Sequence, residues 1–140
     1  MKILIVEDEA LVAFLLETAL MEAGHEALGP VGSVADGLEL TVATVPDLAL
    51  VNINLQSGGS GVDLARTLLE RHGTLSIFVS GNMNEARRAQ DVALGYITKP
   101  YDVNTVVAAV DVAKAILDGQ KPDRIPNGLE LFRNTPPGQG

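Results

Sequence analysis

Residues 46–55 read Pro-Asp-Leu-Ala-Leu-Val-Asn-Ile-Asn-Leu, and this stretch decides the fold of the chain. Its apolar run up to Asn52 is typical of a strand that is buried on both faces of a sheet. The run His25–Val31 is weaker and contains Pro30, which suits a strand at a sheet edge. The other short apolar runs that predict strands are Ile3–Val6, Leu75–Ser80 and Tyr96–Thr98.

Segments with helical spacing of apolar residues separate these five strands. Capping boxes at Ser33-x-x-Asp36 and Ser60-x-x-Asp63 open the second and third helices. The fourth helix, from Asn82 to about Ala93, has few apolar anchors and is predicted to be short. Strands that alternate with helices predict an α/β fold with a doubly wound parallel sheet. For a chain of this length we expect five strands in the flavodoxin-like order 2-1-3-4-5, with five helices.

Polar residues stand where the predicted strands end. Glu7 and Asp8 follow the first strand, Asn52 ends the third, Ser80 ends the fourth, and Lys99 with Pro100 follows the fifth. Ligands of such sheets bind outside the carboxyl ends of the strands, where the strand order reverses. The sequence therefore predicts a site between the first and third strands.

This set of residues, in this order over residues 1–118, resembles the response-regulator receiver family. Members of that family accept a phosphoryl group from a histidine kinase onto one aspartate, which falls on position 52. Asn52 has no carboxylate nucleophile, so we expect no phosphorylation there. The resemblance implies a cytoplasmic, non-enzymatic receiver protein of a two-component system that acts by protein–protein interaction, in effect a pseudo-receiver.

The resemblance also implies a role for each site residue. Lys99 holds phosphoryl oxygens in the family, and Ser80 donates its hydroxyl to them. Ser80 and Tyr96 act together as the switch that reports activation. By the same resemblance, Asp8 binds Mg²⁺ directly and Glu7 binds it through water. We expect magnesium binding to be weak here. The implied metal ligands are Glu7, Asp8, Asn52 and the carbonyl of Asn54.

Two alternatives stay open from the sequence. In the first alternative, the chain is an ordinary phospho-accepting response regulator in which Asn has been substituted for Asp at position 52. More remotely, it is a nucleotide-binding or flavin-binding domain on a similar sheet. Such a domain needs a Gly-rich or hydroxyl-rich phosphate loop after the first strand. Here that loop is Glu7-Asp8-Glu9, which repels phosphate in the absence of a metal.

The distance from Ser80 to Lys99 is 19 residues, about one helical turn shorter than the family pattern, and the missing length falls in the fourth helix. In receivers the fourth helix, fifth strand and fifth helix form the surface for partners and for homodimers. We expect the partner, a histidine kinase or another signalling protein, to bind here. The residues expected to line this surface are Arg87, Arg88, Tyr96 and Tyr101.

Composition bounds the remaining possibilities. The chain has 140 residues, no Cys and a net charge of −8, which argues against binding to nucleic acid or an anionic membrane. Residues 119–140 have the Pro- and Gly-rich composition of a linker, and we expect a flexible tail without an output domain. The alternative is that Leu129, Leu131 and Phe132 dock on the body of the protein or on a partner.

Overall fold

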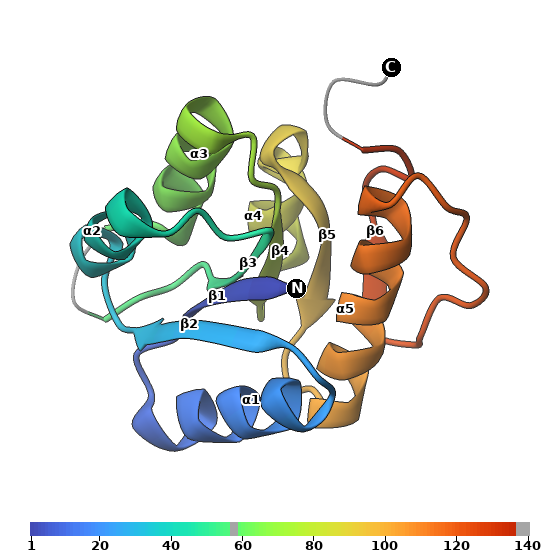
Figure 1. Ribbon diagram of the computed structural model, residues 1–140, viewed down its shortest axis with the longest axis horizontal. Coiled ribbons are helices and arrows are strands. Elements are labelled where there is room, and N and C mark those ends of the chain that lie inside the picture. Colours follow the sequence, from blue (N-terminus) through green and yellow to red (C-terminus); the bar gives the residue numbers. More distant parts are fainter. Residues whose placement is uncertain (57–58, 137–140) are drawn as a thin grey trace.

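The predicted alternation of strands and helices is confirmed by the computed structural model of the protein, which describes residues 1–56 and 59–136 (Figure 1). The strands are β1 (Lys2–Val6), β2 (Glu26–Val31), β3 (Leu48–Asn52), β4 (Ser76–Ser80), β5 (Ala93–Thr98) and β6 (Leu129–Leu131). The helices are α1 (Ala10–Glu22), α2 (Val34–Ala43), α3 (Gly61–His72), α4 (Met83–Arg88) and α5 (Val103–Leu117), with a 3₁₀ turn at Gln90–Val92.

The sheet has the order β2-β1-β3-β4-β5-β6. Its first five strands are parallel and lie in the predicted order 2-1-3-4-5. Every residue of β3 and β4 is buried, as the continuous apolar runs of the sequence predict for strands covered on both faces. The sheet reverses its order between β1 and β3, so a crevice is expected at the carboxyl ends of these two strands.

Helices cover both faces of the sheet. Helices α1 and α5 lie on one face, and α2, α3 and α4 lie on the other (Figure 1). The alternating side chains of each strand are divided between two apolar clusters. Ile3 and Ile5 of β1 pack with α1 and α5, whereas Leu4 and Val6 pack with α3 and α4. This two-sided burial holds the strand ends, and therefore the site, in a rigid frame.

The fourth helix is short, as the sequence predicts, but it ends earlier than the predicted Ala93. Helix α4 ends at Arg88, the 3₁₀ turn follows, and β5 already begins at Ala93. Asn82 caps the helix through its side-chain oxygen, which accepts from the backbone N–H groups of Asn84 and Glu85. Only Ala86 among the helical residues is buried, so little apolar surface stabilises a longer helix.

Helix α1 carries apolar side chains around most of its circumference. Ala13, Leu16 and Leu20 face the core. Leu11 and Phe14 are 70% and 59% exposed, and large side chains of this kind seldom gather on a free surface without a partner. Among the described residues, no helix combines the length and the apolar character that crossing a membrane requires.

The tail departs from the expected flexible segment. Residues 129–131 form β6, which pairs antiparallel with β5 and makes the sheet six-stranded. The expected flexible tail over residues 119–140 is therefore corrected for this part, and docking on the body is confirmed. The physical reason is burial: Leu129 is 9% exposed and joins the core, and Phe132 packs against the opposite cluster. Residues 137–140 lie outside the described part.

Candidate functional site

Three predicted site residues meet at the carboxyl edge of the sheet. Glu7 follows β1, Asn52 ends β3, and Lys99 follows β5. Because parallel strands end at the same edge, three segments distant in sequence place these side chains together. Glu7 and Asn52 are buried, at 5% and 4% exposure.

Asn52 links Glu7 to Lys99 through its side-chain amide. Its Nδ2 donates to Glu7 Oε1 at 3.4 Å. Its Oδ1 accepts from Lys99 Nζ at 3.2 Å and from the backbone N–H of Asn54, also at 3.2 Å. The amide thus supplies a donor to the acid and an acceptor to the base. An ionised carboxylate at this position has no donor to offer Glu7, because it is acceptor-only.

Burial controls the protonation of Glu7. Desolvation raises the pKa of this carboxyl group above its ordinary value. The backbone N–H of Glu9, which donates to Glu7 Oε1 at 3.0 Å, opposes that rise, as do the charge of Lys99 and the hydrogen bond from Asn52. The ionised form of Glu7 therefore depends on its neighbours for stabilisation.

The raised pKa of Glu7 predicts a pH-dependent stability difference. The folded protein holds this proton more tightly than the unfolded chain does, so the contribution is fully present below pH 4.5, the ordinary value, and is lost as pH rises through the folded pKa. We expect Glu7→Gln to raise the melting temperature at pH 7 relative to the unsubstituted chain, with the difference shrinking toward pH 4.5. Thermal melts with a chelator present measure this, and Glu9→Gln, which removes an exposed neighbouring charge, is the control.

At pH 7 we expect Glu9→Gln to change the melting temperature less than Glu7→Gln does. If the advantage of Glu7→Gln is as large at pH 4.5 as at pH 7, protonation of Glu7 is not its source.

The other predicted metal ligands lie on the adjacent loops. The carboxylate of Asp8 accepts from the backbone N–H of Gln56, a contact that the sequence analysis missed because Gln56 belongs to no motif. Asn54 lies two residues before Gln56 in the same loop and forms an isolated bridge with Ser60. Two carboxylates and amide oxygens are hard ligands that suit Mg²⁺. Within residues 1–56 and 59–136, no group of three or more acidic, His or Cys side chains is arranged so that it could hold a metal ion.

The two predicted switch residues lie apart from this network. The hydroxyl of Ser80, fully buried, donates to the carbonyl of Asn82 and accepts from the same residue's N–H. It therefore faces the turn before α4. Tyr96 is 6% exposed and its ring stacks on Phe132 of the tail, with ring centroids 6.2 Å apart.

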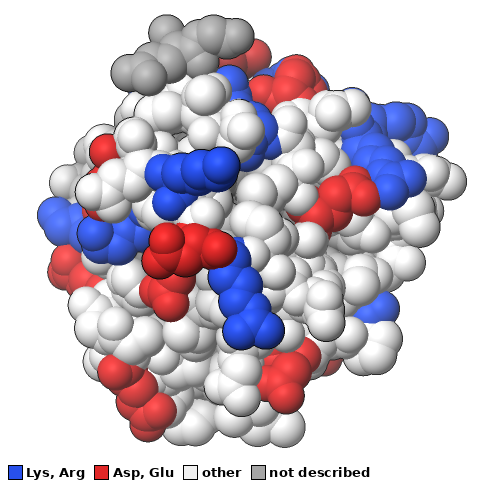
Figure 2. Space-filling model, turned by 90° about the vertical axis from the view of Figure 1, so that its right-hand side faces the viewer, with Lys and Arg blue, Asp and Glu red and all other residues white. Residues whose placement is uncertain are grey.

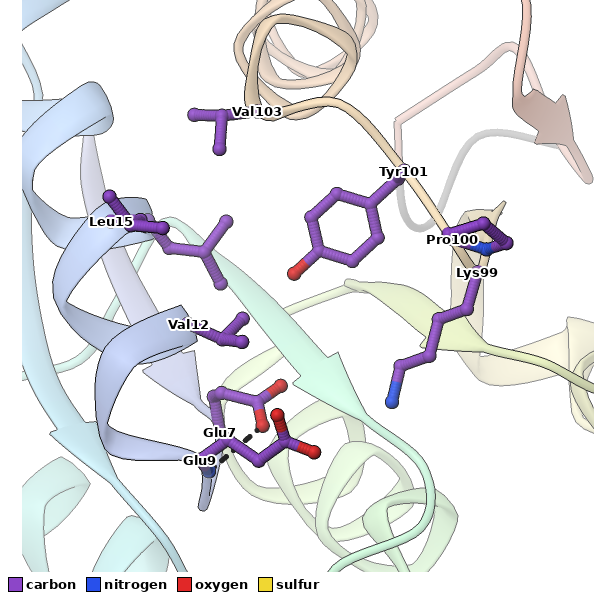
Figure 3. Close-up of a pocket in the computed structure, with 9 residues that line it drawn as sticks. Glu7, Glu9, Val12, Leu15, Lys99, Pro100, Tyr101 and Val103 are labelled. Atoms are coloured by element: carbon purple, nitrogen blue, oxygen red, sulfur yellow. Dashed lines mark hydrogen bonds between the residues drawn. The ribbon is translucent and has the colours of Figure 1, made fainter.

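A cavity of about 420 Å³ opens beside Glu7, between α1 and the start of α5. Figure 3 shows the ammonium group of Lys99 and the hydroxyl of Tyr101 directed toward the carboxylates of Glu7 and Glu9. Burial, then the charges of these two acids, raises the pKa of Tyr101 to about 12. Apolar side chains of α1 line the other side, so the site has a charged end and an apolar wall.

Tyr101 lies apart from Arg87 and Tyr96, with which it is expected to form one partner surface. Tyr101 faces the cavity between α1 and α5, whereas Arg87 contacts the tail. The guanidinium group of Arg87 binds both carboxylate oxygens of Glu130, with Nε 2.8 Å from Oε2. This ion pair also lowers the pKa of Glu130. Sequence reasoning missed Glu130, although its position between Leu129 and Leu131 has the alternation of an edge strand.

Comparison with known proteins supplies the family. Residues 3–111 match the response regulator receiver domain family. The chain is 29% identical over 117 residues to the transcriptional regulatory protein PdtaR of Mycobacterium tuberculosis, covering 80% of this chain and 56% of that protein. It is 33% identical over 122 residues to the transcriptional regulatory protein ResD of Bacillus subtilis, covering 83% and 48%. The chain thus spans about half the length of these relatives.

Solved structures agree with this likeness. The signal receiver domain of a modulated diguanylate cyclase from Desulfovibrio desulfuricans is 30% identical, with a TM-score of 0.69. That match covers 84% of this chain and 97% of the other, so the receiver fold accounts for most of residues 1–140.

Proposed function

The chain belongs to the response regulator receiver domain family, and on that premise we propose that it is a receiver protein that does not accept a phosphoryl group and signals by binding other proteins. Receiver domains are generally non-enzymatic modules of two-component systems and interact with histidine kinases and other signalling proteins.

The amide network of Asn52 carries the proposal. Its Nδ2 donates to Glu7, an expected metal ligand, and its Oδ1 accepts from Lys99, which is expected to hold phosphoryl oxygens. Hydrogen bonds within the protein therefore join the groups that a metal and a phosphoryl group would use. A third carboxylate in this crevice adds repulsion of roughly 4 kcal/mol at about 4 Å and an effective dielectric of about 20. The amide removes that repulsion and stabilises one state without metal. Intact mass after incubation with acetyl phosphate and Mg²⁺ tests the proposal.

Exposed apolar side chains support binding to a protein partner. Leu11 and Phe14 are exposed on α1, the helix that also contributes the apolar wall of the cavity beside Glu7 and Lys99. A protein partner, a histidine kinase among them, fits an apolar surface of this kind. The net charge of −8 disfavours nucleic acid and anionic membranes. Figure 2 views the face of α5 and the tail, where acidic and basic side chains are interspersed. We propose that the protein acts in the cytoplasm.

Magnesium binding in this chain is proposed to be weak. Receiver domains generally bind Mg²⁺ at the acceptor site, and here Asp8, Glu7, Asn52 and the carbonyl of Asn54 would hold it. The ion supplies positive charge that offsets the acids. The residues themselves oppose it, because Lys99 already donates to Asn52 Oδ1 and a neutral amide replaces one charged ligand.

We expect Asn52→Asp to bind Mg²⁺ at least about tenfold more tightly than the unsubstituted chain, which corresponds to about 1.4 kcal/mol. Titration calorimetry measures both affinities directly. Asn104→Asp is the matched control, since it adds the same charge at an exposed position of α5 and should leave the affinity unchanged. Equal affinities for Asn52→Asp and Asn104→Asp would contradict the assigned ligand set.

A further inference from the structure

The outer edge of β5 is occupied by the tail of the same chain. Strand β6 pairs with β5 through Tyr96 opposite Glu130, and two hydrogen bonds extend the ladder at its ends. The N–H of Thr98 donates to Gly128 O at 3.3 Å, and the N–H of Phe132 donates to Leu94 O at 2.8 Å. An edge strand without such a neighbour presents unpaired backbone groups that accept another extended chain.

Side chains give this edge a defined specificity. Leu129 enters the core, and Phe132 stacks on Tyr96 with an interplanar angle of 15°. Between them, the carboxylate of Glu130 is held by both nitrogens of the Arg87 fork. The edge therefore recognises an extended segment with two apolar residues, an acid between them and an aromatic residue next.

Gly95 of β5 makes the close approach possible. A Cβ atom at this position would lie 2.4 Å from Glu130 O and 3.3 Å from Leu129 Cδ1. No ordinary residue fits there while β6 is in place. A Gly95→Ala substitution therefore blocks the pairing of any strand with β5, while the sequence of the pairing strand stays unchanged.

The connection to β6 is loosely packed. Residues 120–127 pass over α5 and enclose a groove of about 760 Å³ with it. Among the contacts that hold the tail, the Arg87–Glu130 pair is partly exposed, with the two side chains at 48% and 37%. Strand β6 is three residues long, and a competing segment with the same pattern can make the same backbone pairing and side-chain contacts with β5.

We propose that the β5 edge is a strand-addition site for a partner protein presenting an extended apolar-acidic-apolar-aromatic segment, and that residues 128–132 close this site until the partner displaces them. This deepens the proposed function and rests on it for its role in signalling. The experiments can contradict either proposal without the other, because peptide binding at β5 does not depend on residue 52.

A fluorescent peptide of residues 126–134 is the probe. We expect the full chain with Leu129→Ser and Phe132→Ser, which releases the tail, to bind this peptide at least about tenfold more tightly than the unsubstituted chain, because the tethered tail no longer competes. Adding Gly95→Ala to the released variant should abolish binding, whereas adding Gly81→Ala should not, since a Cβ at Gly81 has no atom within 4 Å.

Charge exchange tests the recognition of the acid. Arg87→Glu in the released variant should weaken binding of the peptide, and a peptide carrying Glu130→Arg should restore it. Equal binding by the unsubstituted and released chains, or binding that survives Gly95→Ala, overturns the proposal. A chain that sediments as a dimer and becomes monomeric when the tail is released would assign the edge to a second copy and also overturn it.

Hydrogen exchange covers the case in which the released variant does not fold. In the full chain with Glu130→Arg alone, the Thr98 amide, bonded to Gly128, should exchange faster than in the unsubstituted chain. The amide of Lys99, which donates to Ser80 O inside the sheet, should keep its protection. Unchanged exchange at Thr98 would show that the tail is a fixed part of the sheet and would overturn the proposal.

Discussion

Incubation with acetyl phosphate and Mg²⁺ is expected to leave the mass of this chain unchanged and to add one phosphoryl group to the Asn52→Asp variant. The reason is the nucleophile: an amide at position 52 does not attack phosphorus, whereas a carboxylate there does. Two neighbouring groups remain, because Lys99 Nζ lies 3.2 Å from Asn52 Oδ1 and Glu7 Oε1 lies 3.4 Å from Asn52 Nδ2. The adduct should be cleaved by hydroxylamine, as acyl phosphates are.

Two controls make the labelling specific. Asn104→Asp adds a carboxylate on exposed α5 and should stay unlabelled. Asn52→Asp combined with Lys99→Ala should be labelled much more slowly, because the charge that offsets the phosphoryl oxygens is lost. A labelled unsubstituted chain would disprove the proposal that this receiver works without phosphorylation. An unlabelled Asn52→Asp variant would show that the site has lost more than its nucleophile.

The first five strands and the residues at their ends were predictable because their signals are local. A buried strand is a continuous apolar run, and polar residues that end such runs must meet at one edge of a parallel sheet. Glu7, Asn52 and Lys99 are therefore found together in the structure. That Asn52 joins the other two through opposite ends of its amide required coordinates.

The tail was not predictable from composition. Pro and Gly in residues 119–128 indicate a linker, and three residues of strand make too short a pattern to outweigh them. Its docking depends on partners far away in sequence, above all on the space left by Gly95. The same contact explains why Tyr96, expected on an open surface, is covered by Phe132, and why Arg87, about half exposed, is paired with Glu130.

The first residue of α3, which packs against the end of β3, gives the second large effect. Gly61→Ala is expected to lower the free energy of unfolding by about 1–3 kcal/mol, the usual cost of overpacking. A Cβ atom at Gly61 would lie 2.5 Å from the carbonyl oxygen of Asn52, 2.7 Å from Val51 Cγ1 and 2.9 Å from Ile53 Cα. Two of these atoms are backbone atoms, one in the last residue of β3 and one in the residue that follows it, so no side-chain rotation relieves the contact.

Gly81→Ala is the matched control, because it makes the same change where a Cβ meets nothing within 4 Å. Its unfolding free energy should stay within about 0.5 kcal/mol of the unsubstituted chain. Urea unfolding at one temperature compares the three proteins. Equal midpoints for Gly61→Ala and Gly81→Ala would mean that the end of β3 yields easily.

The same substitution connects packing to the chemistry of position 52. In the Asn52→Asp background, a shift of the β3 end moves the new carboxylate relative to Lys99, so Gly61→Ala should slow labelling by acetyl phosphate even where both proteins are fully folded. Gly81→Ala in that background, directly after the neighbouring strand β4, should leave the labelling rate unchanged because its Cβ meets no atom within 4 Å. A rate unaffected by Gly61→Ala, despite lower stability, would show that the carboxylate position is set by Lys99 and Glu7 rather than by the backbone of β3.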